Sequence, residues 1–398
     1  MVTFSGVTYE ELPWVSRIPG DLVSRRQAQR MPTTYRAAIP AAIASVNFTL
    51  PSDLATAAED ATRVISQLDN YAAQAFGGRA VAPLTSVLLR SESASSSQIE
   101  NLTVSARQLA MAELGLAASA NAELVVGNVA AMVAAVDLAD HLDESAILTM
   151  HATLLASQPK VNPGAWRDVP VWIGPSGMSP ESAVFVPPAA ARVPACMADL
   201  AAFLTRTDLP AVMHAAVAHA QFETIHPFID GNGRTGRALM QAMLRASGVI
   251  RQVTVPVSSG LLSNLDAYTT ALTAFHNGDF APIVECLAEA STKAAVLGRW
   301  LVDELGALVG RRLADARPRV GSGFEALIYQ LVAQPAVTVA SVAKSLGLSD
   351  AAANRAVNQA VDAGILKPTS DKQRNRVWLD SQVIDVLNEF AERAGRRV

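Results

Sequence analysis

The segment HPFIDGNGRTGR, from His226 to Arg237, holds most of the residue types that could do chemistry. A glycine-rich turn, residues 230–233, precedes a sequence of helical composition. Free backbone N–H groups at such a turn and the dipole of the following helix together favour an anion. Arg234 and Arg237 are three residues apart, so they share one face of that helix. Because arginine binds phosphate oxygens in pairs, the segment predicts a phosphate site.

Two further side chains suit this segment to phosphoryl or nucleotidyl transfer. Asp230 offers a hard carboxylate oxygen to Mg²⁺, which binds through one or two carboxylates together with substrate phosphates. His226 is a titratable base with an ordinary pKa of about 6.5, and Pro227 predicts that the preceding helix ends near it. A base, a metal carboxylate and an anion site with arginines are the parts that such a reaction needs.

The glycines of the segment also permit two other interpretations. Gly231, Gly233 and Gly236 spell G-x-G-x-x-G, a dinucleotide-binding pattern that requires a hydrophobic strand directly upstream. The upstream sequence has a helical pattern instead and ends in His-Pro. A plain glycine-rich turn between two helices is the second alternative, and it leaves His226 and Asn232 without a role.

The segment closely resembles the signature of the Fic family, H-P-F-x-[DE]-G-N-G-R-x-x-R, and matches its nine specified positions. The resemblance implies a mainly α-helical fold: a Fic-type helical bundle with a β-hairpin flap. It also implies transfer of AMP from Mg·ATP to a Ser, Thr or Tyr hydroxyl of a target protein. On that model His226 is the catalytic base and Asp230 holds Mg²⁺. The nucleotide-binding residues that it implies are Gly231, Asn232, Gly233, Arg234 and Arg237.

Residues 163–188 interrupt the helical sequence and predict a β-hairpin. They contain two β-like pieces, 169–173 and 183–186, around a turn rich in Gly, Pro and Ser. The segment, which includes Gly164-x-x-Arg167, resembles the hairpin flap with which Fic proteins dock their targets, and such an edge can pair with an extended peptide. An ordinary surface hairpin is the alternative. The docking residues that the resemblance implies are Val171, Trp172, Ile173 and Gly174.

A second pattern, SSQIEN at residues 96–101, matches the inhibitory pattern [ST]-x-x-x-E-[GN] of many Fic relatives through Ser96 and Glu100. By this resemblance Glu100 points into the ATP site and pairs with Arg237. There it competes with the γ-phosphate for one guanidinium and repels its charge. A solvated glutamate at a helix start is the alternative. In some relatives the same glutamate serves removal of AMP, so a reverse activity stays open.

Residues near the motif permit weaker inferences. His214 and His219 are five residues apart, which does not place them on one helix face and argues against a zinc pair. Glu223, three residues before His226, either orients its imidazole or is a solvated helix charge. His151 carries no spacing signal.

Residues 338–379 predict a small winged helix-turn-helix domain. Two short helices, 339–346 and 350–363, flank a turn at Gly347, and two strand-like pieces follow around Lys367, Lys372, Arg374 and Arg376. From residue 320 onward, nine lysines and arginines oppose eight aspartates and glutamates. This balance is too even for a strong DNA domain, so DNA binding and protein docking both stay open. The residues that would suit a DNA groove are Asn354, Arg355, Asn358 and Gln359.

The composition agrees with these motifs. The 398 residues are 50% hydrophobic but only 5% aromatic, which favours packed helices over a β-sandwich. We expect an N-terminal helical region with the inhibitory helix at 1–110, a Fic catalytic core at 111–315 and the winged-helix domain at 316–398. The net charge of −4 argues against generic nucleic-acid binding.

The remaining features indicate a soluble cytoplasmic protein. Cys196 and Cys286 cannot build a disulfide framework, and the N-terminal sequence lacks a signal-peptide pattern. The most apolar stretch, 124–139, contains polar breaks and is expected to be a core helix rather than a membrane span. We expect ATP, Mg²⁺ and a hydroxyl-bearing target protein as partners, and self-modification or a homodimer is open. Transfer of another phosphate-containing group, or a nucleotide-sensing transcriptional regulator, are the alternative functions.

Overall fold

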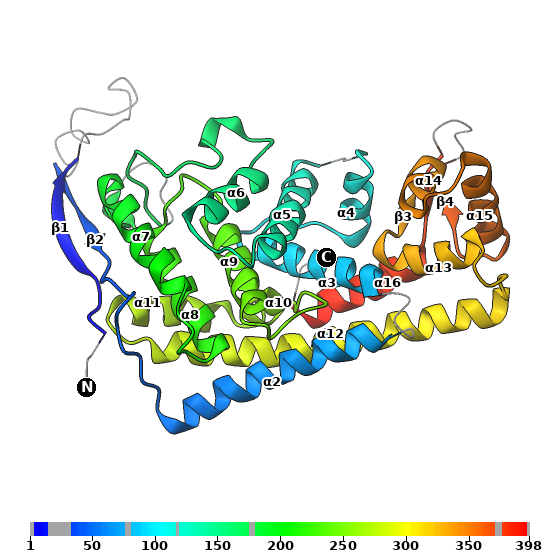
Figure 1. Ribbon diagram of the computed structural model, residues 1–398. Helices are drawn as coiled ribbons and strands as arrows, with labels where there is room; N and C mark the ends of the chain where they lie inside the picture. Colours follow the sequence, from blue (N-terminus) through cyan, green and yellow to red (C-terminus); the bar gives the residue numbers. More distant parts are fainter. Residues whose placement is uncertain are drawn as a thin grey trace, which may run out of the picture.

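The computed structural model describes residues 4–14, 33–75, 81–116, 119–174, 180–370 and 376–395. The fold is mainly α-helical, as predicted (Figure 1). Its α-helices are α2 (Ser52–Gln74), α3 (Val81–Ile99), α4 (Ala106–Glu113), α5 (Ala120–Asp137), α6 (Glu144–Leu154), α7 (Val193–Leu204), α8 (Ala211–Ile225), α9 (Asn232–Ala246), α10 (Val257–Leu262), α11 (Leu265–His276), α12 (Ala281–Ala316), α13 (Gly323–Ala333), α14 (Val339–Leu346), α15 (Asp350–Asp362) and α16 (Ser381–Arg393). Short 3₁₀ turns among the described residues are η3 (Pro159–Val161), η4 (Pro180–Ser182) and η5 (Ala190–Arg192). The strands are β1 (Thr8–Pro13), β2 (Thr34–Ile39), β3 (Ala336–Val337), β4 (Lys367–Pro368) and β5 (Trp378–Leu379).

The long helix α12 extends along one side of the molecule and packs lengthwise against α2 (Figure 1). Alanines and a glycine permit the close approach of the two helices. Ala58 and Ala61 of α2 are buried, and a Cβ on Gly298 of α12 would come within 2.7 Å of the Leu68 side chain. This pair supports the helices of the bundle, since α8, α10 and α11 also pack on α12.

Helix α8 lies at the centre of the largest hydrophobic cluster. Nearly all of its residues are buried, and α7, α9, α11 and α12 pack around it. Buried apolar side chains on every face are what holds a helix in a domain interior. The end of α8 and the start of α9 are therefore held by the core of the molecule.

The N-terminal region differs from the expected helical region at residues 1–110. Strands β1 and β2 form an antiparallel ribbon, with Thr8 opposite Ile39 and Pro13 opposite Thr34. Threonine and tyrosine side chains favour a pleated strand, but the partner strands are separated in sequence, which hides the pairing. The Ala38 N–H donates to Val186 O at 3.0 Å, so the ribbon also contacts the predicted flap.

The flap has less regular structure than the two predicted strands. Ile173 and Phe185 form an isolated antiparallel bridge, with Ile173 N donating to Phe185 O at 2.8 Å. Around this bridge, residues 169–172 and 183–186 are not strands. Hydrogen bonds at the base of the flap, made by Arg167 to His226 O and Pro188 O, hold the flap in place of a strand pair. Residues 175–179, where the turn was predicted, lie outside the described residues.

The C-terminal unit contains the two predicted short helices, α14 and α15. A capping box at Thr338 starts α14, Gly347 ends it with a φ of 63°, and Ser349 caps α15. Strands β3, β5 and β4 form a small antiparallel sheet, in which β3 had not been predicted. Lys372 and Arg374 lie outside the described residues, and the winged-helix assignment stays a prediction. The four residues proposed to suit a DNA groove are exposed: Asn354, Arg355, Asn358 and Gln359.

One helix in the described part of the chain, α5, is long and apolar enough to cross a membrane by length and composition. It packs against α3, α6 and α9. In its middle, the buried Asn128 side chain donates to Ser93 O at 2.8 Å and to Ser97 Oγ at 3.0 Å. These are the contacts of a helix inside a folded domain.

Candidate functional site

The predicted motif forms the connection between α8 and α9. Helix α8 ends at Ile225, and His226 then adopts a left-handed conformation with φ 49° and ψ 62°. The chain turns through Gly231, whose φ is 78°, and α9 begins at Asn232. The helix end near His226 is thus confirmed, because Pro227 cannot continue a helix. The turn thus connects His226 to the start of α9 through five residues, 227–231.

An anion already lies at the N-terminus of α9. A Cβ on Gly233 would stand 2.1 Å from Glu100 Oε1, so the Glu100 carboxylate lies directly against the Gly233 backbone. A side chain at this position would therefore displace the Glu100 carboxylate from the start of α9. The first turn of a helix carries partial positive charge and unpaired N–H groups. This position therefore fits the predicted phosphate site, and here it faces a side-chain carboxylate.

Glu100 lies just beyond the C-terminal end of α3, where Asn101 has a φ of 61°. The alternative of a glutamate at a helix start is therefore wrong. A carboxylate is unfavourable at the end of its own helix because the dipole is negative there. Its favourable partner comes from another helix: Arg237 Nη2 donates to Glu100 Oε1 at 2.9 Å. Burial raises the pKa of Glu100 and is the largest single effect. The charge and hydrogen bond of Arg237, together with the charges of Arg234 and His226, outweigh it, so the pKa lies below its ordinary value.

Arg237 joins both residues of the predicted inhibitory pattern. Its side chain is 1% exposed, Nε donates to Ser96 Oγ at 2.9 Å, and Nη2 donates to Ser96 O at 2.8 Å. Ser96 and Glu100 are four residues apart, so the end of α3 presents both to the same guanidinium. The structure thus contains the Glu100–Arg237 contact that the resemblance implied.

Arg234 has donors that no described group accepts. The residue is 3% exposed, and its Nη2 lies 3.7 Å from Asp230 Oδ1. Its Nε and Nη1 are buried without a hydrogen-bond partner. Burial lowers the pKa of Arg234. Because unpaired buried donors of a cation are costly, this guanidinium fits a site that an anionic ligand completes.

Asp230 has the properties of a single magnesium ligand. Its side chain is 49% exposed, and Oδ1 accepts the Gly231 N–H at 2.7 Å. Across the described ranges no group of three or more His, Cys, Asp or Glu could hold a metal. A protein cage is therefore absent there, but Mg²⁺ needs only one or two carboxylates when phosphates supply other oxygens. The exposed Asp230 carboxylate fits that role.

The His226 imidazole is enclosed and has no hydrogen-bond partner at Nδ1. Glu223 Oε2 lies 3.8 Å from Nδ1, which is beyond hydrogen-bond distance. Burial, with the charge of Arg167 adding to it, lowers the pKa of His226 to about 4. Glu223 is buried rather than solvated, and burial raises its pKa to about 8. At neutral pH the imidazole is therefore neutral and able to accept a proton.

Two side chains hold the loop in ways that the sequence did not reveal. Asn232 Oδ1 accepts the Phe228 N–H at 2.8 Å, and its Nδ2 donates to Phe228 O at 2.9 Å. The Asn232 side chain therefore faces the loop. His151 Nδ1 accepts the Gly164 N–H at 2.9 Å, so Nε2 donates to Asp230 O at 3.0 Å. The His151 ring also stacks on Phe228, with ring centroids 3.6 Å apart. The spacing of His151 from the motif gave no signal for this contact.

The predicted docking residues lie on the flap beside the β1–β2 ribbon. Ile173 is 37% exposed, and Val184 opposite is 78% exposed. Trp172 packs edge-on against Trp14 with ring centroids 5.4 Å apart. A groove of about 380 Å³ separates the ribbon from the residues after the flap turn. Ile173 is thus an exposed apolar residue, and Trp172 packs the flap against the residue that follows β1. The other two predicted docking residues, Val171 and Gly174, flank this pair on the first arm of the flap.

Comparison with known proteins gives the following similarities. A model of the Fic/DOC family matches residues 141–244. The chain is 29% identical over 169 residues to the protein adenylyltransferase Fic of Drosophila grimshawi, which is 40% of this chain and 30% of that protein. The Drosophila willistoni protein of the same name matches with the same identity and coverage. The match thus spans about 30% of the length of these curated relatives.

Among solved structures, a Fic family protein from Desulfovibrio desulfuricans is 22% identical and has a TM-score of 0.51. The match covers 83% of this chain and 97% of that one. A Fic domain containing signaling protein from Bacteroides thetaiotaomicron is 18% identical with a TM-score of 0.50, over 61% of this chain and 97% of that one. These likenesses concern the fold.

Proposed function

We propose that this chain, whose residues 141–244 match the model of the Fic/DOC family, is a protein adenylyltransferase. It transfers AMP from ATP to a Ser, Thr or Tyr hydroxyl of a target protein. The observation that carries this proposal is the Glu100 carboxylate against Gly233 at the start of α9, paired with Arg237. An anion is stable there, and a triphosphate offers the same chemistry with more charge.

In this mechanism His226 accepts the proton of the target hydroxyl. The oxygen attacks the α-phosphorus, the bond from that phosphorus to the bridging oxygen breaks, and pyrophosphate leaves. The neutral imidazole, with its pKa lowered to about 4 mainly by burial, is in the form that a general base requires. The reaction thus adds AMP to the hydroxyl and gives one proton to the histidine.

Backbone donors at the start of α9 stabilise the charge that builds on the α-phosphate oxygens. They come from the N–H groups of Asn232 and Gly233, since the Gly231 N–H donates to Asp230 Oδ1. Such preorganised donors supply a large part of catalysis. The guanidinium groups of Arg234 and Arg237 bind the outer phosphates. Mg²⁺, held by Asp230, neutralises phosphate charge when it is bound. The buried unpaired donors of Arg234 support this assignment.

Glu100 keeps the resting enzyme largely inactive in this proposal. Its carboxylate uses the Arg237 Nη2 donor that the γ-phosphate needs, and it adds a repulsive charge. ATP that binds beside Glu100 would have a displaced α-phosphate, and small displacements reduce rates strongly. Ser96 supports the arrangement by holding Arg237 from α3.

Replacement of Glu100 tests the proposal. We expect Glu100→Gly to label proteins from ATP carrying ³²P at the α-phosphate at least about tenfold faster than the unchanged protein, because one competing charge is removed. Glu59→Gly, which changes an exposed glutamate of α2, is the matched control and should not accelerate labelling. His226→Ala in the Glu100→Gly background should abolish it.

The same reagents separate the alternatives. Glu100→Gly that labels no faster than the unchanged protein contradicts the inhibitory role, and no covalent label at all contradicts the transferase. Loss of label from a previously modified target, catalysed by the unchanged protein, would indicate the reverse reaction. Mass spectrometry of labelled proteins, including the enzyme itself, would identify the target and the modified hydroxyl.

A further inference from the structure

The Arg167 side chain binds the turn that carries His226. Its Nε donates to His226 O at 2.9 Å and its Nη2 to Ile225 O at 3.4 Å, while its backbone N–H donates to Pro227 O at 2.9 Å. One residue thus holds three consecutive carbonyls. His226 has a left-handed conformation that residues with a Cβ adopt at some energetic cost. Contacts on either side of it stabilise that conformation.

The same guanidinium binds both arms of the flap. Arg167 Nη1 donates to Val169 O at 3.1 Å, and Nη2 donates to Pro188 O at 2.6 Å. Val169 lies on the first arm and Pro188 at the end of the second. A planar, rigid fork of donors fixes the direction of each acceptor. The flap base and the His226 turn therefore share one side chain.

Arg167 is a buried cation that has no carboxylate partner in the described part of the chain. It is 3% exposed, and its side-chain hydrogen bonds go to main-chain carbonyls. Burial lowers its pKa to about 10. Burial of a charge without a carboxylate partner is unfavourable, but an apolar residue here would leave the carbonyls that Arg167 binds without a donor. The planar guanidinium distinguishes arginine from an apolar residue, because its several donors connect the flap to the His226 turn.

We propose that Arg167 is a positioning residue that fixes the distance and angle between the flap and the His226 imidazole. This inference rests on the proposed function, in which the flap aligns the target segment whose hydroxyl His226 deprotonates. The flap and the imidazole must then stand in one geometry, because displacement of about 1 Å can reduce a rate about a hundredfold. Arg167 touches neither the nucleotide-binding residues of α9 nor Glu100 among its hydrogen bonds.

Hydrogen exchange tests the connection without activity. In Arg167→Lys we expect peptides over 222–230 and over 183–190 to exchange about tenfold faster, both together, because one ammonium cannot replace the fork. Arg192→Lys is the matched control: Arg192 is exposed, pairs with Glu10 and binds neither segment through its side chain. Faster exchange in one segment alone, or in neither, overturns the proposal. Should Arg167→Lys fail to fold, Arg167→Gln, which keeps one amide donor group, is measured in the same way.

Kinetics in the Glu100→Gly background test the positioning role. We expect Arg167→Lys to lower kcat for AMP transfer to the identified target about a hundredfold, with the Kd for ATP changed by less than about threefold. A parallel loss of ATP affinity would make Arg167 a structural support of the nucleotide site and would overturn the proposal, as would an unchanged kcat. If Glu100→Gly itself transfers nothing, the proposed function fails, and hydrogen exchange still decides whether Arg167 joins the two segments.

Discussion

At the scale of single residues, the His226 imidazole combines a strained backbone with a neutral ring. Four charged or titratable neighbours surround it, and they belong to different segments. Arg167, with burial, lowers its pKa, whereas Glu100 and Asp230 raise it, and Glu223 lies 3.8 Å from Nδ1. The result is a pKa of about 4, well below the ordinary value of 6.5. This ring is unprotonated over the whole physiological range.

This pKa predicts the acidic side of the pH–rate profile. In the proposed mechanism the deprotonated ring is the active base, so the rate should rise with pH through the pKa of His226 and be constant above it. We expect transfer by Glu100→Gly to be flat from about pH 6 to pH 8, since removal of Glu100 lowers the His226 pKa further. Labelling rates in a series of buffers measure this. A half-maximal rate near the ordinary pKa of about 6.5 would show that the ring is solvated during catalysis.

The sequence predicted the site residues whose role follows from local spacing. Arg234 and Arg237 share a helix face, and Pro227 ends α8, so both features follow from the residues themselves. His151 could not be found in this way, because its contact with Asp230 connects residues 79 apart. Nor does a sequence pattern reveal which carbonyls Arg167 binds. Only the packed fold brings those groups together.

At the scale of elements, helix α3 is the part that would connect the proposed inhibition to the site. Ser96 Oγ in its last turn accepts from Arg237 Nε, and Glu100, the next residue after the helix, accepts from Arg237 Nη2. Two neighbouring hydrogen bonds thus hold the helix end on α9. Glu100 opposes the dipole of its own helix, and the Arg237 contact compensates for it. Loss of either contact should therefore weaken the hold of α3 on the site.

Ser96→Ala tests this element. The change removes the acceptor of a buried charged donor, which is worth about 1 kcal/mol or more, and we expect basal transfer to rise about threefold to tenfold. Ser97→Ala is the neighbouring control, because Ser97 Oγ accepts from Asn128 instead. The ³²P-labelling assay with the otherwise unchanged protein measures both. Equal rates for the two variants would show that Glu100 alone holds the helix end.

Elements were predictable to the extent that their pattern is local. The helices of the bundle and the caps of α14 and α15 follow from periodicity and from Thr338 and Ser349. The β1–β2 ribbon was missed because strand pairing depends on a partner 21 to 31 residues away in sequence. The two flap strands were predicted from β-like residues such as Val184, but Val184 is exposed and the described flap residues form one isolated bridge, Ile173–Phe185, in place of a strand pair.

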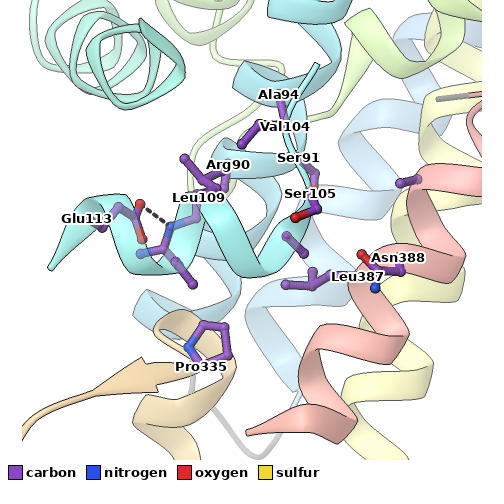
Figure 2. A pocket seen from close by; sticks show the side chains of 13 residues that line it. Arg90, Ser91, Ala94, Val104, Ser105, Leu109, Glu113, Pro335, Leu387 and Asn388 are labelled. Atoms are coloured by element: carbon purple, nitrogen blue, oxygen red, sulfur yellow. Dashed lines mark hydrogen bonds and ion pairs between the residues drawn. The ribbon is translucent and has the colours of Figure 1, made fainter. Parts of the chain in front are cut away.

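At the scale of the whole molecule, the C-terminal unit, here α13 to α16, packs against α3, the helix that precedes Glu100. Helices α13 and α16 contact α3, while α9 contacts α3 as well. A small cavity of about 30 Å³ is lined by Ser91 of α3 and by Leu387 and Asn388 of α16. Figure 2 labels these residues around it. The Arg90–Glu113 ion pair of α3 and α4 borders the same cavity. A partner bound to the C-terminal unit would therefore bind next to α3, the helix that precedes Glu100.

One buried ion pair attaches the C-terminal unit to α12. Arg312 donates to both oxygens of Asp380 at 2.6 Å, with side chains 5% and 0% exposed, and Asp380 also caps α16. Asp380→Asn leaves the guanidinium buried without its charge partner, which costs about 3–5 kcal/mol. Glu389→Gln breaks the exposed Arg393 pair and should cost less than about 1 kcal/mol.

Denaturant unfolding of the two variants measures this difference, and labelling from ATP measures its consequence for the site. If the C-terminal unit holds α3 against α9, Asp380→Asn should both lose stability and raise basal transfer, whereas Glu389→Gln should change neither. Lost stability with unchanged transfer would mean that the bundle alone holds Glu100 on Arg237. The C-terminal unit would then have no influence on the anion site, because its destabilisation would not change the position of α3.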